Sequence, residues 1–434
     1  MGWPLSVAPL DRGPPSIVPP SVFSPRPLIV RPPRSAYLHI PFCHRRCFYC
    51  DFAVVPLGDH ADGSTSASIS TYLEQLQSEI LNNSAGPPLS TVYLGGGTPS
   101  MLTPAQVGGL LKVLRQRFGL APGAEVTLEL DPASFDQDRL QGYLGMGVNR
   151  ISLGGQSFDD TVLERLGRRH RSRDLDQAIR WLQAARHQGS LASWSLDLIQ
   201  GLPGHDRDHW HEQLHCAIAA APPHLSIYDL IIEPGTVFAR QQQQGVLTLP
   251  EDDLAADLME LTAARLGDAG YGQYEISNHA LPGHASRHNR VYWSGAGWWG
   301  FGMGATSAPW GERRAHPRTR ASYAEAIREQ LSASQELTQP QEAQLASGAG
   351  VPFDDLLLVG LRRREGVALG RLAQERGVGQ HSLDALALRL TPFRQRGLLL
   401  IEGERWRLQA PAGLALSNAV LREILAWWDD LKAP

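Results

Sequence analysis

The sequence is poor in cysteine, in long apolar runs and in unbalanced charge. Only four of its 434 residues are cysteine, which excludes a disulfide-stapled secreted fold for so long a chain. The sequence contains no apolar run long enough for a membrane helix, and its start lacks the apolar core of a secretory signal. Its 44 acidic and 40 basic residues give no argument for binding nucleic acid. We therefore expect a cytoplasmic protein.

Residues 1–34 differ in composition from the rest of the chain. They hold ten prolines, four arginines and a single acid, Asp11. Such a segment buries too little apolar surface to offset the entropy lost on ordering, so we predict a disordered lead. A transit-like tail and a start codon placed too early are the alternatives, and the sequence does not choose among them.

Short apolar runs alternate with segments of helical periodicity from residue 35 onward. Strands are predicted at residues 37–40, 91–94, 125–130, 150–153, 193–199 and 225–230. Helices are predicted between them, at residues 71–81, 104–117, 159–166, 175–186 and 209–220. This alternation indicates an α/β fold with a parallel sheet, and six units favour an incomplete (β/α)6 barrel. Ligands should then bind at the carboxyl ends of the strands.

The pattern changes after residue 250. A predicted helix at 252–266 precedes a stretch rich in Gly, Trp and Tyr, and residues 398–401 and 405–408 suggest a hairpin. We therefore divide the chain into a lead (1–34), a partial barrel (35–250), a covering segment (251–340) and a small helical, winged-helix-like C-terminal domain (341–434).

Three of the four cysteines fall within eight positions. Cys43, Cys47 and Cys50 follow the first predicted strand directly, so their thiolates can face the ligand-binding end of the sheet. Three thiolates leave one iron of a [4Fe-4S] cluster open, whereas an electron-transfer cluster normally has four cysteine ligands. Zinc is the rival, since His39 or His44 could complete a Cys3His site.

Polar residues also occur where later strands end. Gly95-Gly96-Gly97 closes the second strand, where the backbone can approach a ligand without an intervening Cβ. Glu129, Gln156 and Asp197 lie at the ends of the third, fourth and fifth strands. Each could contact a ligand or form a hydrogen bond within the barrel core, and these alternatives stay open here.

The motifs together resemble the radical SAM superfamily. Residues 37–43 (YLHIPFC), 95–99 (GGGTP), 147–152 (GVNRIS), 156–158 (QSF) and 197–203 (DLIQGLP) look like those of its coproporphyrinogen dehydrogenase group. The resemblance covers the chain from about residue 35 to its end. It implies a [4Fe-4S] cluster on the three cysteines and bound S-adenosylmethionine.

Two features resemble the heme chaperone branch of that group. Asp51-Phe52 follows the third cysteine, where the dehydrogenases carry an additional cysteine. His288-Asn289-Arg290-Val291-Tyr292-Trp293 matches the His-Asn-x-x-Tyr-Trp motif that this branch links to heme. The resemblance implies a heme site at His288, Asn289, Tyr292 and Trp293, and a neutral imidazole is a good axial ligand of heme iron. Core packing is the alternative for the aromatic pair.

The resemblance also assigns the S-adenosylmethionine contacts by position. The residues implied are Tyr37, Tyr49, Gly96, Gly97, Thr98, Glu129, Gln156, Arg168 and Asp197. Two positions depart from the family pattern: Gly155 replaces the usual Val, and Thr306 replaces a common His. The second departure leaves His288 as the main candidate for the heme ligand.

The expected function is that of a heme chaperone, which holds heme and passes it to apo-hemoproteins. The acceptors would be respiratory or related proteins at the membrane, and a homodimer is a further expectation. An oxygen-independent coproporphyrinogen III dehydrogenase is the alternative from a different class, and a zinc-stabilised barrel without redox chemistry is the third.

Overall fold

The computed structural model describes residues 32–59, 61–336 and 351–432. Most of the predicted lead, residues 1–31, and the predicted boundary near residue 340 lie outside these ranges.

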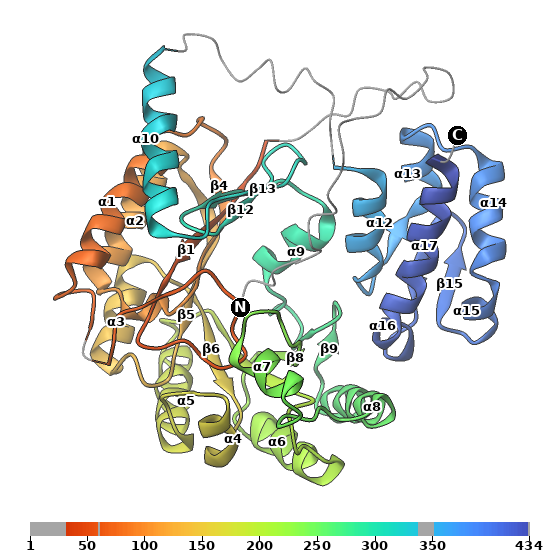
Figure 1. Ribbon diagram of the computed structural model, residues 1–434, viewed down its shortest axis with the longest axis horizontal. Helices are drawn as coiled ribbons and strands as arrows, with labels where there is room; N and C mark the ends of the chain where they lie inside the picture. Colours follow the sequence, from red (N-terminus) through yellow and green to blue (C-terminus); the bar gives the residue numbers. More distant parts are fainter. Residues whose placement is uncertain (1–31, 60, 337–350, 433–434) are drawn as a thin grey trace.

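All six predicted strands form, and they lie next to one another in a parallel sheet (Figure 1). Each strand hydrogen-bonds to the next one along the chain, and helices make the crossovers between β4 and β8. The strands are β1 (Ser35–Ile40), β4 (Leu89–Gly96), β5 (Leu120–Leu130), β6 (Arg150–Gln156), β7 (Ser193–Gln200) and β8 (His224–Asp229). The predicted α/β class with a six-stranded parallel core is thereby confirmed.

The predicted covering segment extends this sheet at both edges. β11 (Trp299–Phe301) pairs in parallel with β1, while β10 (Asn278–Ala280) pairs antiparallel with β8 and with β9 (Gly272–Gln273). The sheet therefore has nine strands. These added strands are two or three residues long, too short to show the period of two by which strands are recognised in a sequence.

Helices surround the sheet, as Figure 1 shows from α1 and α2 round to α6 and α8. Their ends follow local rules: Thr103 and Gln106 form a capping box at the start of α2, and Gly147 ends α3 in the left-handed conformation. The helices of the barrel are α1 (Ala67–Asn82), α2 (Pro104–Arg117), α3 (Gln137–Met146), α4 (Asp160–Arg165), α5 (Ser172–His187), α6 (Arg207–Ala219), α7 (Val237–Gln243) and α8 (Asp252–Asp268). The sequence does not predict α3 and α7, because few of their residues are apolar and buried: Leu140 and Tyr143 in α3, and Phe238 in α7.

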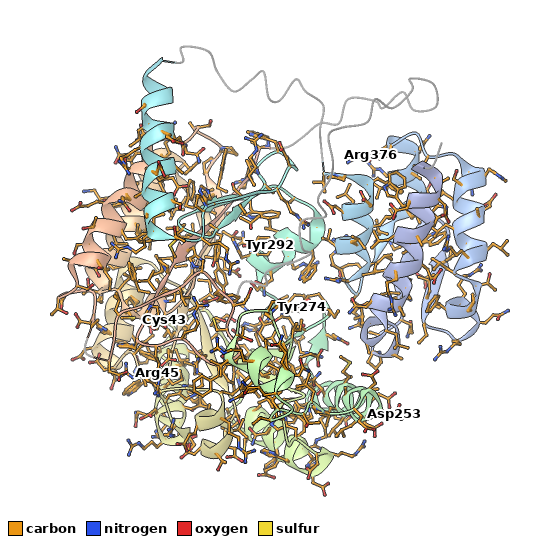
Figure 2. The ribbon with its side chains drawn as sticks, viewed as in Figure 1. Cys43, Arg45, Asp253, Tyr274, Tyr292 and Arg376 are labelled. Atoms are coloured by element: carbon orange, nitrogen blue, oxygen red, sulfur yellow. The ribbon has the colours of Figure 1, made fainter. Side chains whose placement is uncertain are left out.

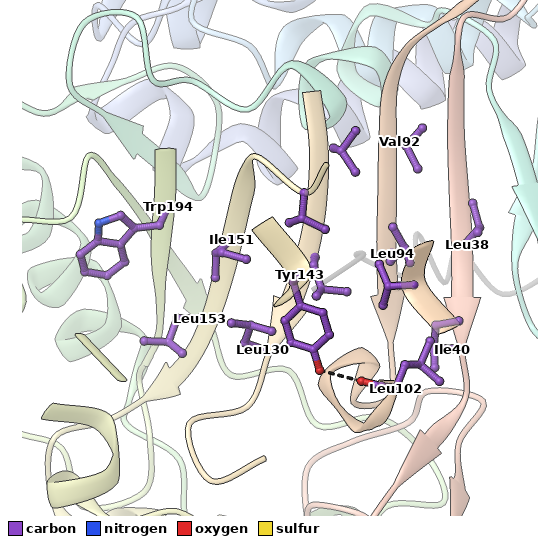
Figure 3. Close-up of a cluster of buried hydrophobic side chains, with 14 of the residues drawn as sticks. Leu38, Ile40, Val92, Leu94, Leu102, Leu130, Tyr143, Ile151, Leu153 and Trp194 are labelled. Atoms are coloured by element: carbon purple, nitrogen blue, oxygen red, sulfur yellow. Dashed lines mark hydrogen bonds between the residues drawn. The ribbon is translucent and has the colours of Figure 1, made fainter. Parts of the chain in front are cut away.

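The two faces of the sheet bury different side chains. Apolar residues such as Leu94, Ile151 and Trp194 face the helices, where Tyr143 of α3 packs among them and donates a hydrogen bond to the carbonyl of Leu102 at 2.6 Å (Figure 3). Because side chains alternate along a strand, the other face carries buried polar groups: Thr91, Glu125, Thr127, Arg150, Ser152, Ser195, Asp197 and His224. The barrel interior is therefore polar.

Two two-stranded sheets, a 3-10 turn and one further helix lie beside the main sheet. β2 (Phe42–Cys43) follows β1 and pairs with β3 (Val55–Pro56), and a 3-10 turn (Pro99–Met101) follows β4. β12 (Thr306–Ser307) pairs with β13 (Arg314–Ala315), and α10 (Arg320–Glu336) packs on α1.

The C-terminal region has its own hydrophobic cluster. It is mainly helical, with a three-stranded sheet in the order β14-β16-β15. Its elements are α12 (Phe353–Leu361), β14 (Val367–Ala368), α13 (Leu369–Glu375), α14 (Gln380–Arg389), α15 (Thr391–Gln395), β15 (Leu399–Glu402), β16 (Arg405–Leu408), α16 (Ala412–Ala415) and α17 (Ser417–Lys432). Its α12 contacts α9 (Arg287–Ser294), the helix that carries the His-Asn-x-x-Tyr-Trp motif.

Candidate cofactor site

The three cysteines lie on one loop at the carboxyl edge of the sheet. Figure 2 labels Cys43 where this loop begins. The loop is fixed to the end of α4, because the backbone N–H of Phe48 donates to the carbonyl of Leu166 at 3.0 Å. Cys43, Cys47 and Cys50 are free thiols, and all three line one pocket. The pocket encloses about 1450 Å³ of empty space including its mouth.

Burial keeps two of these thiols protonated when no metal is bound. Desolvation raises the pKa of Cys43 to about 12 and that of Cys50 to about 11. Iron binds the thiolate, so cluster assembly at these positions releases protons. In the described ranges no group of three or more His, Cys, Asp or Glu side chains is placed to hold one metal ion.

The glycines after β4 allow the backbone to pass close to the cysteine loop. Gly96 has a φ of 114°, a backbone conformation that residues with a Cβ rarely adopt. A Cβ on Gly97 would lie 2.6 Å from the carbonyl oxygen of Phe42 and 2.9 Å from Sγ of Cys43. Gly97 is therefore required by close packing against the thiol loop, whereas a Cβ on Gly96 would meet the ring of His39.

We expect Gly97→Ala to lower the iron content of the reconstituted protein severely, because the new methyl group displaces Cys43 from its position. Iron and sulfide analysis after anaerobic reconstitution measures this. Gly145→Ala is the matched control, since Gly145 is helical and its Cβ would meet no atom within 4 Å. Full iron content in Gly97→Ala would contradict the packing argument.

Glu129 and Asp197 are hydrogen-bonded inside the barrel and also line the pocket. Glu129 accepts from the hydroxyl of Tyr93 at 2.8 Å and from the backbone N–H of Gly96 at 3.0 Å. Asp197 accepts from the hydroxyls of Ser152 at 2.7 Å and Ser195 at 3.1 Å. The barrel hydrogen bonds expected from the sequence are therefore present, and the same carboxylates lie where a ligand in the pocket could reach them.

Arg168 connects the cysteine loop to the strand ends. Its guanidinium donates to Oδ2 of Asp131 at 2.6 Å, to the carbonyl of Gly154 at 2.9 Å and to Sγ of Cys47 at 3.7 Å. Burial opposes the ionisation of Asp131, but the charge of Arg168 holds the pKa of this carboxyl well below its usual range. The pair is thus charged at neutral pH.

Gln156 is strained and unsatisfied in the pocket wall. Its φ is 65°, which is unusual for a residue other than glycine. The side chain is only 1% exposed, and neither its amide oxygen nor its amide nitrogen has a hydrogen-bond partner in the protein. Buried polar atoms without partners are costly, so this amide suits a polar ligand in the pocket.

The pocket gathers most of the residues proposed from the sequence. With the three cysteines it is lined by Tyr49, Gly96, Gly97, Thr98, Glu129, Gln156, Arg168 and Asp197. Tyr37 is not among the lining residues: its hydroxyl bonds with Nδ1 of His39 at 3.0 Å inside the barrel. The lining also includes Asp131, whose place at the end of the third strand is visible in the sequence, and Ser152, Tyr228 and Asp229, which lie within strands and were not predicted as site residues.

The motif helix α9 lies away from this pocket. The ring of His288 is fully buried, with Nδ1 2.8 Å from the hydroxyl of Thr91 and Nε2 2.8 Å from the hydroxyl of Tyr292. Burial lowers the pKa of His288 to about 3, so the imidazole is neutral at physiological pH. Both ring nitrogens are already engaged, and a metal could reach neither without a rearrangement of α9.

The other motif residues pack around the same helix. The backbone N–H of Asn289 donates to the hydroxyl of Ser286, the N-cap residue, at 3.2 Å. The ring of Tyr292 makes an edge contact with Trp298 at 4.9 Å, and Trp293 is buried beside the guanidinium of Arg362 from the C-terminal region. The Trp and Tyr pair thus has packing roles in this conformation.

The comparisons with known proteins agree with this arrangement. The family model of the radical SAM superfamily matches residues 37–217. The heme chaperone HemW of Synechocystis is 40% identical over 87% of this chain and 89% of its own length. The heme chaperone HemW of Escherichia coli is 38% identical over 64% of this chain and 71% of its own.

One solved structure has a similar fold. Coproporphyrinogen III oxidase (HemN) from Escherichia coli, described as a radical SAM enzyme, superposes with a TM-score of 0.72 over 92% of this chain and 90% of that one. The two are only 23% identical, so this match speaks for architecture and not for activity.

The superfamily implies a [4Fe-4S] cluster and S-adenosylmethionine, and the residues present fit both. Three thiols, an unsatisfied amide and several carboxylates, among them Glu129 and Asp197, share one pocket next to glycines that admit no Cβ. The match to this superfamily favours a [4Fe-4S] cluster over zinc. From its identity to HemW proteins over most of its length, the chain belongs to the HemW family of heme chaperones within the radical SAM superfamily.

Proposed function

We propose that this protein is a heme chaperone, which binds heme and transfers it to apo-hemoproteins. The observation that carries the proposal is the 40% identity to a HemW protein over 87% of the chain. Asp51-Phe52 after the third cysteine agrees with it, because the dehydrogenases resembled by this sequence have an additional cysteine there. Delivery of heme, and not turnover of a porphyrin, is then the main role.

We further propose that Cys43, Cys47 and Cys50 hold the cluster and that the lining groups hold S-adenosylmethionine. The backbone from Gly96 to Thr98 and the side chains of Gln156 and Asp197 offer hydrogen-bonding groups to the nucleoside and amino acid parts. When bound, the cluster would supply a redox-active centre with one iron open to a ligand. Arg168 fixes the cysteine loop against the strand ends and keeps positive charge beside the thiolates.

His288 is our proposed heme ligand. Its neutral imidazole suits the iron, but in the described conformation both ring nitrogens are hydrogen-bonded and the ring has no exposed surface. Heme ligation by His288 therefore requires α9 to leave its place on the barrel. Asn289, Tyr292 and Trp293 would be exposed by the same movement, and the aromatic rings could then contact the macrocycle.

The proposed setting is the cytoplasm, with respiratory or related apo-hemoproteins at the membrane as heme acceptors. None of the described helices has the length and apolarity needed to cross a bilayer. We also propose that the chain acts as a homodimer. The nearly balanced charge gives no reason to add nucleic acid to these partners.

A heme titration tests the proposal. We expect anaerobically purified, reconstituted wild type to bind heme stoichiometrically, and His288→Ala to bind it at least about tenfold more weakly because the axial bond to iron is lost. His279→Ala is the matched control, since His279 is also a buried histidine but lies on β10 outside the motif. Coproporphyrinogen conversion is assayed on the same samples. Efficient conversion without stable heme binding would favour the dehydrogenase instead.

A further inference from the structure

The pocket and the motif helix lie at opposite ends of the barrel interior. Strand β4 finishes with the glycines that line the pocket, whereas Thr91, which contacts His288, lies near the start of that strand. Figure 2 labels Tyr292 on α9 and Cys43 on the cysteine loop, at separate places in the barrel. What fills the interior between them determines whether the two ends can influence each other.

The first turn of α9 is bound to a carboxylate on strand β5, inside the barrel. The carboxylate of Glu125 accepts from the backbone N–H groups of Arg287 at 3.1 Å and His288 at 3.0 Å. These are unpaired groups of the first helical turn, which a carboxylate satisfies with favourable charge. Arg150 lies 3.8 Å from the same carboxylate. The helix is thus held by groups inside the barrel.

The next layer is aromatic. The ring of His288 stacks on that of Tyr93 with the centroids 5.2 Å apart and the planes at 29°, and Tyr93 stacks in turn on Tyr37 at 6.1 Å. Tyr292 approaches the edge of His288 at 5.1 Å while donating or accepting through its hydroxyl at Nε2. A displacement of α9 therefore removes the surface against which Tyr93 rests.

The last layer belongs to the pocket. The hydroxyl of Tyr93 donates to Oε1 of Glu129, and Oε2 of the same carboxylate accepts from the N–H of Gly96. A Cβ on Gly95 would lie 2.7 Å from the ring of Tyr93 and 2.9 Å from Oε1 of Glu129, so these groups are in tight contact. Three consecutive contacts hence join His288 to the backbone that lines the S-adenosylmethionine pocket.

The outer side of α9 faces the C-terminal region. The guanidinium of Arg362 lies 5.9 Å from the ring centre of Trp293, and Arg290 forms an ion pair with Glu365. The helix thus lies between the barrel interior and α12. Its release would also break these contacts.

We propose that Tyr93 and His288 are positioning residues that couple α9 to the S-adenosylmethionine pocket. With α9 in place, the stacked rings hold Glu129 where it orients Gly96 for the ligand; with α9 displaced, that orientation is lost. Coupling of this kind is reciprocal, so bound S-adenosylmethionine stabilises α9 on the barrel. The inference rests on the proposed S-adenosylmethionine site and not on heme binding.

Hydrogen exchange of the α9 amides with and without S-adenosylmethionine tests the coupling on the reconstituted full chain. In wild type the ligand is expected to slow exchange in residues 287–294. Tyr93→Phe keeps the ring stack but removes the hydrogen bond to Glu129. Because a hydrogen bond to a charged group contributes substantially to stability, we expect its loss to raise the Kd for S-adenosylmethionine by about tenfold. The ligand-dependent protection of α9 should then disappear.

Two further variants separate coupling from folding. Tyr323→Phe is the matched control, because the buried hydroxyl of Tyr323 donates to Oε2 of Glu79 at 2.6 Å outside the pocket; it should leave both readouts as in wild type. Tyr292→Phe removes the hydrogen bond to His288 at the far end, so it should speed α9 exchange and also raise the Kd for S-adenosylmethionine.

The outcomes distinguish this inference from the chaperone proposal. Protection of residues 94–98 by S-adenosylmethionine without protection of α9 in wild type would overturn the coupling, as would full protection of α9 in Tyr93→Phe. No binding of S-adenosylmethionine to wild type would overturn both the site and the coupling. Heme titration is a separate readout: its failure contradicts the chaperone and leaves the exchange result standing.

Discussion

Alanine in place of Cys47 should leave the protein without a stable iron–sulfur cluster. Cys47 is one of only three thiols on the loop. The wild-type cluster already has one iron without a cysteine ligand, so the loss of Cys47 would leave only two cysteines, too few to retain the cluster. After anaerobic reconstitution, iron should fall from about four per chain to near zero, and the visible absorption of the cluster should be lost. S-adenosylmethionine binding should weaken in parallel, because the open iron is one of its expected anchors.

Cys216→Ala is the control for this change. Cys216 is on α6, is not among the pocket residues and has its thiol 3.8 Å from Oε1 of Glu212. Its loss should leave the iron content at the wild-type value. If Cys47→Ala retained a full cluster, or if wild type instead held one zinc per chain, the assignment of the loop would be wrong.

The sequence predicts the sheet because the signal is local and repeated. Each of the six core strands is an apolar run buried on the helix side, such as Ile151 and Leu153 of β6. Once the strands are taken to be parallel, residues at their carboxyl ends must share one edge. That geometric rule places Glu129, Gln156 and Asp197 at one edge of the sheet, but their assignment to an S-adenosylmethionine site came from the family resemblance.

The environment of the motif helix could not be predicted in the same way. Thr91 and His288 are 197 positions apart and still share a hydrogen bond. No local pattern shows that contact, nor that Glu125 caps α9 from inside the barrel. The same limit applies to Tyr37, which follows the family motif but has its hydroxyl bonded to His39. Long-range pairings decide which motif residues are exposed.

The polar interior changes how the barrel residues are interpreted. A hydrogen-bonded core residue and a ligand contact are usually treated as competing interpretations of a buried carboxylate. In this barrel the carboxylate of Glu129 is bonded to Tyr93 on one oxygen and to the pocket backbone on the other. Under the proposed S-adenosylmethionine site, structural and ligand-orienting roles would be combined in one group, and substitutions there should affect stability and binding together.

Replacing Arg168 by methionine should destabilise the apo protein by about 3 kcal/mol, because removal of one partner leaves the other charge poorly solvated. The side chains of Arg168 and Asp131 are only 11% and 20% exposed. Urea unfolding at pH 7 measures the loss. Arg314→Met is the control, since its ion pair with Glu312 at 2.8 Å is exposed on both sides and should contribute less than about 1 kcal/mol.

The pH dependence separates the ion pair from the loss of packing. Arg168 holds the folded-state pKa of Asp131 below its unfolded value of about 3.9. The stabilisation is therefore fully present above pH 4 to 5 and is lost as the pH falls through the folded-state pKa. The difference in unfolding free energy between wild type and Arg168→Met should shrink as the pH is lowered from 7 towards 3. A difference that stayed constant over this range would mean that Arg168 stabilises the cysteine loop through its contacts with Gly154 and Cys47 and not through its charge on Asp131.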